Sequence, residues 1–333
     1  MGHTMKLSLR RRGAAIGAGA VACLAVASVA VGASTQNPTY NLKALKGSVT
    51  ADGSSTVGPY TTAAAELFRK AGASGVKVTV GISGTGGGFQ RFCKGEIDLS
   101  DASRPMKISE AQACKDSNIG SWRAFTVAND ALTVVVNQQN TWAKCLSVEE
   151  LKKIWDQGSK VSNWKDVRAG FPDVPLKLFG PGTDSGTFDY FTEAINGKSK
   201  RSRSDYQASE DDNVLVQGVS GERGGMGYFG FSYYEENKSR LNAVQIRNPK
   251  TGQCVTPGID SVQSGSYKPL ARPLFIYAKG SSFTRKEVQA FLDYIFDNEA
   301  RIATRADFVP LTKAQLKRAR TNFALAVKAA DPN

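Results

Sequence analysis

Hydroxyl-bearing side chains and glycines gather in residues 81–107, which contain the run SGTG at 83–86 and the pair Ser103-Arg104. Glycine has no side chain, so the backbone N–H groups of such a run can approach a ligand closely. A helix that begins in the run presents unpaired N–H donors and partial positive charge. Together with hydroxyls and a guanidinium, these donors suit a small oxyanion.

Two further loops have the same chemistry. Residues 54–57 read SSTV, and residues 184–187 read DSGT. Each of the three loops follows a predicted strand and precedes a predicted helix. One such loop is ordinary helix capping. Three of them beside Arg104 indicate a shared anion pocket, because ligands of open α/β sheets bind beyond the carboxyl ends of the strands.

The glycine run does not match the motifs of nucleotide-binding or hydrolytic enzymes. It lacks the GK[ST] of a P-loop and the GxGxxG with a downstream acid that is typical of a dinucleotide fold. It is not a nucleophile elbow either, since the run from Gly81 to Gly84 is followed by Thr85.

The chain has a single histidine, His3, which lies in the predicted leader described next. The mature protein would therefore have no histidine. This excludes Ser-His-Asp and Cys-His catalysis and every histidine-ligated metal site. We predict no catalytic residue, no metal site and no cofactor.

Residues 1–33 are predicted to be a secretory signal. Lys6 and the arginines at 10–12 precede an apolar run over 14–31 and small residues near 33. The alanine and glycine content of the run disfavours a transmembrane anchor. Export by the general or the twin-arginine route and lipidation at Cys23 both stay open, and residues 34–46 are expected to be a flexible lead-in.

The mature chain is basic. Loss of residues 1–33 removes four basic and no acidic side chains, which lowers the formal net charge from +13 to +9. A basic surface favours anionic partners. The densest basic cluster, at 198–203, alternates with serine and is interpreted as a solvated loop. Because aromatic residues do not interleave with it, we expect no nucleic-acid partner.

Four cysteines follow the leader: Cys93, Cys114, Cys145 and Cys254. An even number in an exported chain indicates two disulfides, for which three pairings exist. Sequence order favours Cys93 with Cys114 and Cys145 with Cys254. The first pair would close a loop of about twenty residues, worth about 3 kcal/mol on the chain-entropy model.

Strands and helices alternate along the mature chain, as in α/β sheets. Long strand runs at 124–137, with an interruption at Asn129-Asp130, and at 267–277 connect two blocks. The pattern predicts two lobes hinged across a cleft, with lobe I at 47–127 and 262–333 and lobe II at 128–261. The other expected strands are 46–51, 76–82, 96–100, 174–179, 224–230 and 241–246, and the closing helices are 284–297 and 312–328.

Six segments together resemble the periplasmic or extracellular phosphate-binding proteins of ABC-type phosphate transporters, over nearly all of the mature chain. The resemblance implies the two-lobe, Venus-flytrap architecture of a type II periplasmic binding protein, with two crossover strands. It also implies a dehydrated phosphate between the lobes and hinge closure on binding. The segments are the loop at 52–58, GTGGGF at 84–89, ASRP at 102–105, TDSGTF at 183–188, GGMGYFGFSYY at 224–234 and PLARPLFIY at 269–277.

Carried over residue by residue, the resemblance implies phosphate contacts in all three loops. Thr56 with the Val57 amide matches the first, Thr85 with Ser83 nearby matches the second, and SGT matches the third. The expected phosphate-binding residues are Ser55, Thr56, Val57, Ser83, Thr85, Ser103, Arg104, Ser185, Gly186 and Thr187.

The chain departs from the family pattern at two positions. Well-known members have an arginine four residues before SGT, where this chain has Pro181. They also have an aspartate that accepts the proton of phosphate, where this chain has Ser103. We hypothesise that Arg104 replaces the arginine. Asp101, Asp184, a hydroxyl or a carbonyl would then accept the proton.

The implied function is capture of inorganic phosphate and its delivery to an ABC transporter permease. We expect a monomeric binding protein in the periplasm or on the extracellular face of the cell envelope. The alternatives are a secreted phosphatase-like enzyme of the same fold and a binder of another tetrahedral oxyanion such as sulfate. Sulfate stays open because a pocket made only of donors would not distinguish it from phosphate.

Overall fold

Strand β4 (Trp122–Asn137) lies near the centre of a nine-stranded sheet in the computed structural model, which describes Met1 and residues 40–183, 185–209 and 211–330. Residues 2–33 of the predicted signal, which include Cys23, and Asp184 lie outside the described residues. The strand order is β2-β1-β3-β12-β4-β8-β6-β7, with β9 paired to β4. The other strands are β1 (Gly47–Gly53), β2 (Val76–Gly81), β3 (Leu99–Ala102), β6 (Lys177–Gly180), β7 (Gln207–Ala208), β8 (Gly225–Gly230), β9 (Leu241–Ala243) and β12 (Ala271–Lys279).

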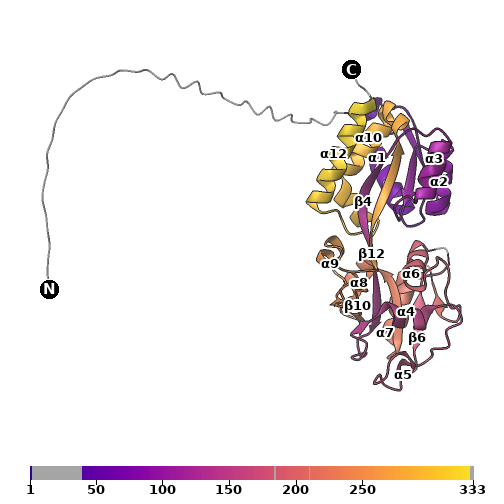
Figure 1. Cartoon of the computed structure of the whole chain (residues 1–333), viewed down its shortest axis with the longest axis vertical. Coiled ribbons are helices and arrows are strands. Elements are labelled where there is room, and N and C mark those ends of the chain that lie inside the picture. Colours follow the sequence, from indigo (N-terminus) through magenta and orange to yellow (C-terminus); the bar gives the residue numbers. More distant parts are fainter. Residues whose placement is uncertain (2–39, 184, 210, 331–333) are drawn as a thin grey trace. The chain divides into compact units, whose positions relative to one another are not determined.

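Strands β4 and β12 connect the two halves of this sheet (Figure 1). The first part of β4 is antiparallel to β12, and residues Leu132–Val136 are antiparallel to β8. On its other side β12 pairs with β3. The two connecting strands expected from the sequence are therefore confirmed, although β12 begins at Ala271 rather than near residue 267.

The interruption predicted at Asn129-Asp130 is wrong, because β4 continues through both residues. Both polar side chains are buried and both have partners. The Asn129 Nδ2 group donates to the Pro310 carbonyl at 3.2 Å, and Asp130 forms an ion pair with Arg272. Buried polar groups with partners are compatible with a strand.

The helices follow the strands that the sequence pattern predicted, and several begin with caps. In α4 the Ser147 hydroxyl accepts a hydrogen bond from the Glu150 N–H at 3.2 Å, and the Glu150 carboxylate accepts one from the Ser147 N–H. This is the expected capping box. The helices are α1 (Gly58–Lys70), α2 (Gly84–Cys93), α3 (Ile108–Asp116), α4 (Val148–Trp155), α5 (Trp164–Val167), α6 (Gly186–Asn196), α7 (Asp212–Gly221), α8 (Phe231–Asn237), α9 (Ile259–Gln263), α10 (Lys286–Asp297), α11 (Glu299–Arg305) and α12 (Lys313–Ala330).

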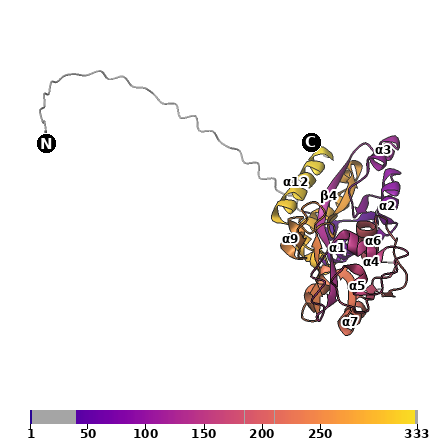
Figure 2. The same ribbon diagram turned by 60° about the horizontal axis from the view of Figure 1, so that its bottom comes forward.

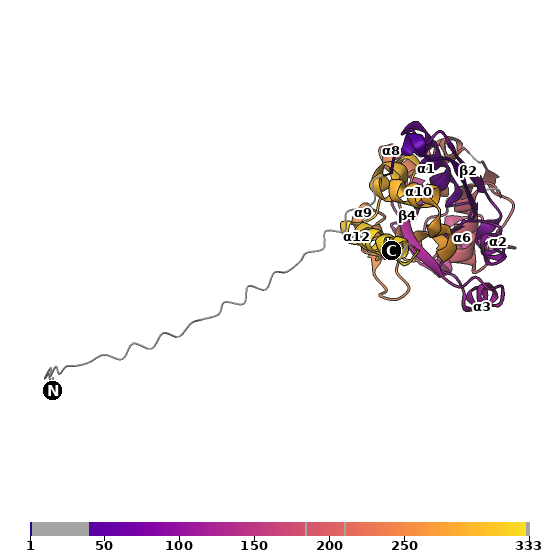
Figure 3. The same cartoon turned by 90° about the horizontal axis from the view of Figure 1, so that it is seen from above.

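Alternate residues of β12 enter different cores, because successive strand side chains point to opposite faces. Leu274 and Ile276 pack with α1, α10 and α12, whereas Phe275 and Tyr277 pack with α2 and α3. Figure 3 shows these two groups of helices on opposite sides of β4. In the other half of the sheet α4 lies beside α6 (Figure 2).

Two large apolar clusters confirm the predicted α/β fold with two lobes. One includes β1, α1, α10 and α12 together with Phe125 of β4. The other surrounds residues 131–136 of β4 with α4, α6, β6 and β8. The described residues from Tyr40 onward belong to a single compact unit. The residue boundaries of the lobes stay a prediction.

Both expected disulfides are present. Cys93–Cys114 joins the ends of α2 and α3, with the two Cα atoms 4.2 Å apart. Cys145–Cys254 joins β5 (Cys145–Leu146) to β11 (Cys254–Val255) on either side of β10 (Gln245–Arg247), with a Cα–Cα distance of 6.0 Å. The pairing favoured by sequence order is confirmed.

Candidate functional site

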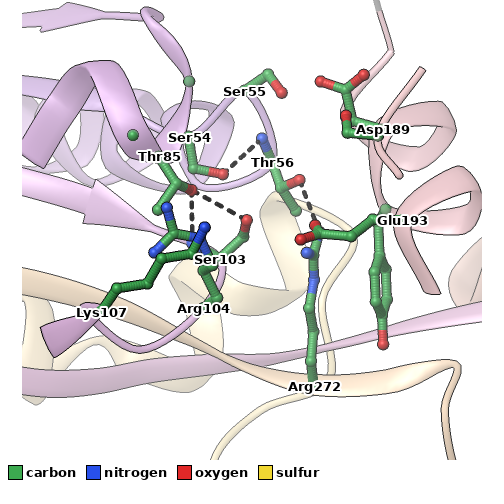
Figure 4. Close-up of a pocket in the computed structure, with 14 residues that line it drawn as sticks. Ser54, Ser55, Thr56, Thr85, Ser103, Arg104, Lys107, Asp189, Glu193 and Arg272 are labelled. Atoms are coloured by element: carbon green, nitrogen blue, oxygen red, sulfur yellow. Dashed lines mark hydrogen bonds between the residues drawn. The ribbon is translucent and has the colours of Figure 1, made fainter. Parts of the chain in front are cut away.

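The carboxyl ends of β1, β2 and β3 open into one polar cavity of about 260 Å³ (Figure 4). These strands are parallel neighbours, so the loops that follow them lie together at one edge of the sheet. The cavity is lined mainly by hydroxyl, guanidinium, ammonium and carboxylate groups. Its residues are Ser54, Ser55, Thr56, Gly84, Thr85, Gly86, Ser103, Arg104, Lys107, Asp189, Tyr190, Glu193, Ser199 and Arg272.

The first loop is folded around Ser54, whose hydroxyl accepts hydrogen bonds from the Thr56 and Val57 N–H groups at 3.2 and 3.4 Å. Ser55 and Thr56 line the cavity, and Val57 does not. Val57 is fully buried in the apolar core, and its amide is already engaged by Ser54. The structure therefore brings Thr56, but not Val57, to the cavity.

The second loop contributes through Thr85. The Thr85 hydroxyl lies 3.2 Å from the Ser103 hydroxyl and accepts a hydrogen bond from the Ser103 N–H at 3.2 Å. The start of α2 and the residue that follows β3 are thus joined at the cavity wall. Ser83 does not line the cavity, and its N–H donates to the Asp52 carboxylate at 2.9 Å.

The third loop, residues 185–187, contacts Thr56 of the first loop. Ser185 caps α6 by accepting a hydrogen bond from the Thr187 N–H at 3.1 Å. Ser185, Gly186 and Thr187 line a neighbouring cavity of about 250 Å³, which Ser55 and Thr56 also line. The Thr56 hydroxyl donates to the Gly186 carbonyl at 3.4 Å. The expected residues are therefore divided between two cavities that share Ser55 and Thr56.

Arg104 lines the first cavity, but its charge already has a partner. Its two terminal nitrogens donate to the two oxygens of Glu110 at 2.9 and 2.8 Å. The guanidinium also lies 5.7 Å from the centre of the Phe89 ring. The hydrogen bonds with Glu110, followed by the charge of that carboxylate, raise the pKa of Arg104 against the effect of burial. A ligand would share Arg104 with Glu110.

A second arginine in the cavity, Arg272 of β12, was not predicted. It donates from Nη2 to the Thr56 hydroxyl at 3.0 Å and pairs with Asp130 at 3.3 Å. Its guanidinium lies 3.5 Å from the centre of the Tyr190 ring, and its side chain is 12% exposed. Arg272 therefore joins the first loop, the two connecting strands and α6.

The sequence contained one sign of this role. Arg272 and Asp130 lie opposite each other in the pairing of β12 with β4, and buried charges occur in pairs. An arginine in one predicted connecting strand and an aspartate in the other could have been read as such a pair. The contact with Thr56 could not, because the two residues are 216 positions apart.

Asp101 does not line either cavity that contains Thr56. It is fully buried in β3, where its Oδ1 accepts a hydrogen bond from the Thr61 hydroxyl at 3.0 Å. Its Oδ2 has no hydrogen-bond partner among the described residues. Burial, opposed by Thr61 and aided by the charge of Asp52, raises the pKa of Asp101 to about 7. Asp101 is therefore a buried carboxyl beneath the site.

We expect Asp101→Asn to stabilise the protein more at pH 8 than at pH 5. The unfolded carboxyl ionises near its ordinary pKa of 3.8, whereas the folded one keeps its proton until about pH 7. Unfolding is thus favoured by ionisation, so wild-type stability falls as pH rises from about 4 to about 7. Asparagine removes this dependence and keeps an oxygen for Thr61. Equal changes in Tm at the two pH values would contradict this prediction.

Comparison with known proteins places the chain in a family. Residues 33–299 match the model of a PBP superfamily domain. The chain is 47% identical over 310 residues to Protein SphX of Synechococcus elongatus, covering 92% of this chain and 87% of the relative. It is 37% identical over 278 residues to the phosphate-binding protein PstS of Staphylococcus epidermidis, covering 83% and 82%. The chain belongs to the phosphate-binding protein family.

A solved structure supports the fold of this family member. A possible phosphate binding protein from Planctomyces limnophilus is 47% identical and superimposes with a TM-score of 0.81, covering 85% of this chain and all of the other. Within the described part of this phosphate-binding protein family member, no group of three or more His, Cys, Asp or Glu side chains is placed to hold a metal ion. Among the described helices, none is both long and apolar enough to cross a membrane.

Proposed function

We propose that the protein captures inorganic phosphate in the cavity between its two lobes and delivers it to an ABC transporter permease. The observation that carries this proposal is the hydrogen bond between Arg272 and Thr56, which places a guanidinium among the hydroxyls of the predicted oxyanion loops. Charge-assisted hydrogen bonds to oxyanions are the strong ones. The relationship to the phosphate-binding protein PstS supports the same ligand.

The proposed ligands are the Thr56, Thr85 and Ser103 hydroxyls, the N-terminal amides of α2 and the guanidinium of Arg272. Arg104 would contribute through the face that Glu110 leaves open. Ser185, Gly186 and Thr187 would complete the shell from α6, through the cavity that shares Thr56 with the first. We propose that the protein acts as an exported monomer in the periplasm or on the extracellular face of the envelope, and that it is not an enzyme.

Calorimetry on the mature protein with phosphate, arsenate and sulfate tests this function. We expect one phosphate to bind per chain with micromolar or tighter affinity, about 8 kcal/mol or more. Tight sulfate binding with no response to phosphate would overturn the assignment. Sustained hydrolysis of a chromogenic phosphate ester in the presence of divalent metals would instead indicate the phosphatase-like alternative.

Gly186→Ala should weaken phosphate binding without unfolding the protein. A Cβ atom at this position would lie 2.8 Å from the backbone nitrogen and the hydroxyl of Thr56. Overpacking of this kind costs about 1–3 kcal/mol. If the bound state needs the contact between Gly186 and Thr56, phosphate affinity should therefore fall roughly 10–100-fold.

The matched control for this variant is Gly221→Ala in α7, where an added Cβ meets no atom within 4 Å. We expect Gly221→Ala to bind phosphate as the wild type does. Wild-type affinity in Gly186→Ala would mean that the contact between Thr56 and Gly186 is not needed in the bound state.

A further inference from the structure

The serines of the three loops differ in whether they cap the N–H groups that follow them. The Ser54 hydroxyl accepts hydrogen bonds from two N–H groups of its own loop, and the Ser185 hydroxyl accepts one from the Thr187 N–H at 3.1 Å. Ser83 stands in the corresponding position before α2, but its side chain accepts no capping hydrogen bond. The N–H groups at the start of α2 are therefore not satisfied by a serine, as those of the other two loops are.

The uncapped N–H groups belong to residues that line the cavity, namely Gly84, Thr85 and Gly86. The first N–H groups of a helix have no acceptor within the helix itself. Among the described residues, no side chain or loop carbonyl accepts a hydrogen bond from these three N–H groups. They are the amides that the proposed function assigns to phosphate, so whatever keeps Ser83 from capping them bears directly on phosphate affinity.

Ser83 is held by a carboxylate that does not line the cavity. Asp52 of β1 is 2% exposed, accepts a hydrogen bond from the Ser83 N–H at 2.9 Å and forms an ion pair with Arg91 of α2. Burial acts to raise the pKa of Asp52, but hydrogen bonds from the hydroxyl and N–H of Ser83 and from Arg91 outweigh it, so the pKa lies below its usual value. Asp52 is therefore ionised, and Ser83 donates to it with both of its polar groups.

The backbone of Ser83 does not have the conformation of a capping residue. A capping serine is normally extended, as Ser185 is with φ −79° and ψ 132°. Ser83 instead has φ −100° and ψ 6°, and Gly84 after it is left-handed with φ 78°. Glycine adopts this conformation without strain. The contact with Asp52 thus fixes a turn in which the serine does not cap its helix.

Asp52 is also enclosed between β2 and α2. A Cβ atom at Gly81 would lie 2.8 Å from the carboxyl carbon of Asp52, and one at Gly88 would lie 2.9 Å from its carbonyl oxygen. The residue therefore contacts the end of β2 and the middle of α2 at once. Its negative charge by itself disfavours an anion in the neighbouring cavity. Any favourable contribution of Asp52 to phosphate binding is therefore a matter of position.

We propose that Asp52 is a positioning residue of the phosphate site, which holds Ser83 and thereby leaves the first N–H groups of α2 to the ligand. This inference rests on the proposed function. Without the carboxylate, the Ser83 hydroxyl would accept a hydrogen bond from the Thr85 or Gly86 N–H, as a serine before a helix commonly does. Phosphate would then compete with an internal acceptor for the same donors and would bind more weakly.

Calorimetric titration of Asp52→Ala and Asp52→Asn with inorganic phosphate at pH 7.5 tests this role. Removal of a negative charge alone would raise phosphate affinity, whereas loss of the positioning contact should lower it. We expect phosphate affinity to fall about 10-fold or more in Asp52→Ala. The fall should be smaller in Asp52→Asn, because the amide oxygen can still accept from the Ser83 N–H.

Glu96→Gln is the matched control. Glu96 also pairs with Arg91, at 3.1 Å, and the substitution removes the same charge without touching Ser83. Its phosphate affinity should stay within about threefold of the wild type, because the pair is exposed. An equal loss in Glu96→Gln and Asp52→Asn would overturn the inference, since the ion pair with Arg91 would then determine the affinity.

The double variant Asp52→Ala/Ser83→Ala separates capping from a general disturbance of the loop. Without the hydroxyl, no serine side chain competes for the N–H groups of α2. The double variant should therefore bind phosphate about threefold or more tightly than Asp52→Ala does. Equal or weaker binding would overturn the inference, because Ser83 would then not be the competing acceptor.

Wild-type or higher phosphate affinity in Asp52→Ala would also overturn the inference and leave the proposed function standing. Failure of the wild-type protein to bind phosphate would overturn both. Thermal unfolding of each variant is measured first, and the titrations are made well below the lowest Tm. If Asp52→Ala does not fold, Asp52→Asn and Asp52→Asn/Ser83→Ala provide the same two comparisons.

Discussion

Replacing Arg272 with alanine is expected to weaken phosphate binding about 100-fold or more. A hydrogen bond from a charged group contributes about 1.5–3 kcal/mol, and Arg272 is the guanidinium that contacts Thr56. Its removal also leaves Asp130, which is 5% exposed, as a buried carboxylate without its partner. Breaking a buried ion pair costs about 3–5 kcal/mol. Calorimetric titration with phosphate measures the effect on affinity, and thermal unfolding measures the effect on stability.

Two further variants separate charge from geometry. The double variant Arg272→Ala/Asp130→Asn should recover stability but not phosphate affinity, because it removes the unpaired charge without restoring a donor.

Arg104→Ala is expected to weaken phosphate binding by more than about 1.5 kcal/mol, as the loss of a shared charged hydrogen bond should, and by less than Arg272→Ala. Near-wild-type affinity in Arg272→Ala together with a large loss in Arg104→Ala would mean that Arg104, and not Arg272, supplies the main positive charge for phosphate.

Removing the disulfide Cys145–Cys254 should lower the free energy of unfolding more than removing Cys93–Cys114. The first pair is separated by 109 residues and the second by 21. On the chain-entropy model a loop of about 100 residues corresponds to about 4.7 kcal/mol and one of about 20 residues to about 3 kcal/mol. Denaturant unfolding of the two Cys→Ser double variants, compared with the oxidised wild type, measures both changes.

Phosphate affinity provides the control for these variants. None of the four cysteines lines the cavities that contain Thr56, so both double variants should bind phosphate with wild-type affinity where they are folded. The opposite order of stabilities would show that packing outweighs loop entropy. The pair at 93 and 114 is the more buried one, and its replacement also disturbs the cluster that contains Phe89 and Phe92.

Local patterns were sufficient for most of the fold. The strand–loop–helix units at β1–α1, β2–α2 and β6–α6 could be predicted because hydroxyl and glycine residues separate an apolar run from a helical stripe. Helix α11 was not predicted. Its seven residues begin one residue after the end of α10, so their apolar positions do not form a helical pattern of their own. The break predicted in β4 was wrong because the partner of Asp130 lies on a distant strand.

The candidate site was predictable to the extent that it is built from helix starts. Thr56, Thr85, Ser103 and Arg104 line one cavity, as expected of loops at the same edge of a sheet. Val57 and Ser83 do not line this cavity, and their N–H groups have partners within the protein, so their phosphate contacts stay predictions. The contact of Arg272 with Thr56 could not be predicted from sequence, because the two residues are 216 positions apart. An arginine in a strand is common, and only the three-dimensional contacts distinguish this one.

Each disulfide closes within one part of the molecule. Cys93–Cys114 belongs to the cluster that includes Phe89, and Cys145–Cys254 joins two short strands of the separate sheet β11-β10-β5. Among the described residues, no covalent cross-link other than the backbone ties one large apolar core to the other. Neither disulfide would therefore restrain a movement of one large core relative to the other. The rates of phosphate uptake and release, measured below the unfolding temperature, should be the same in oxidised and reduced protein.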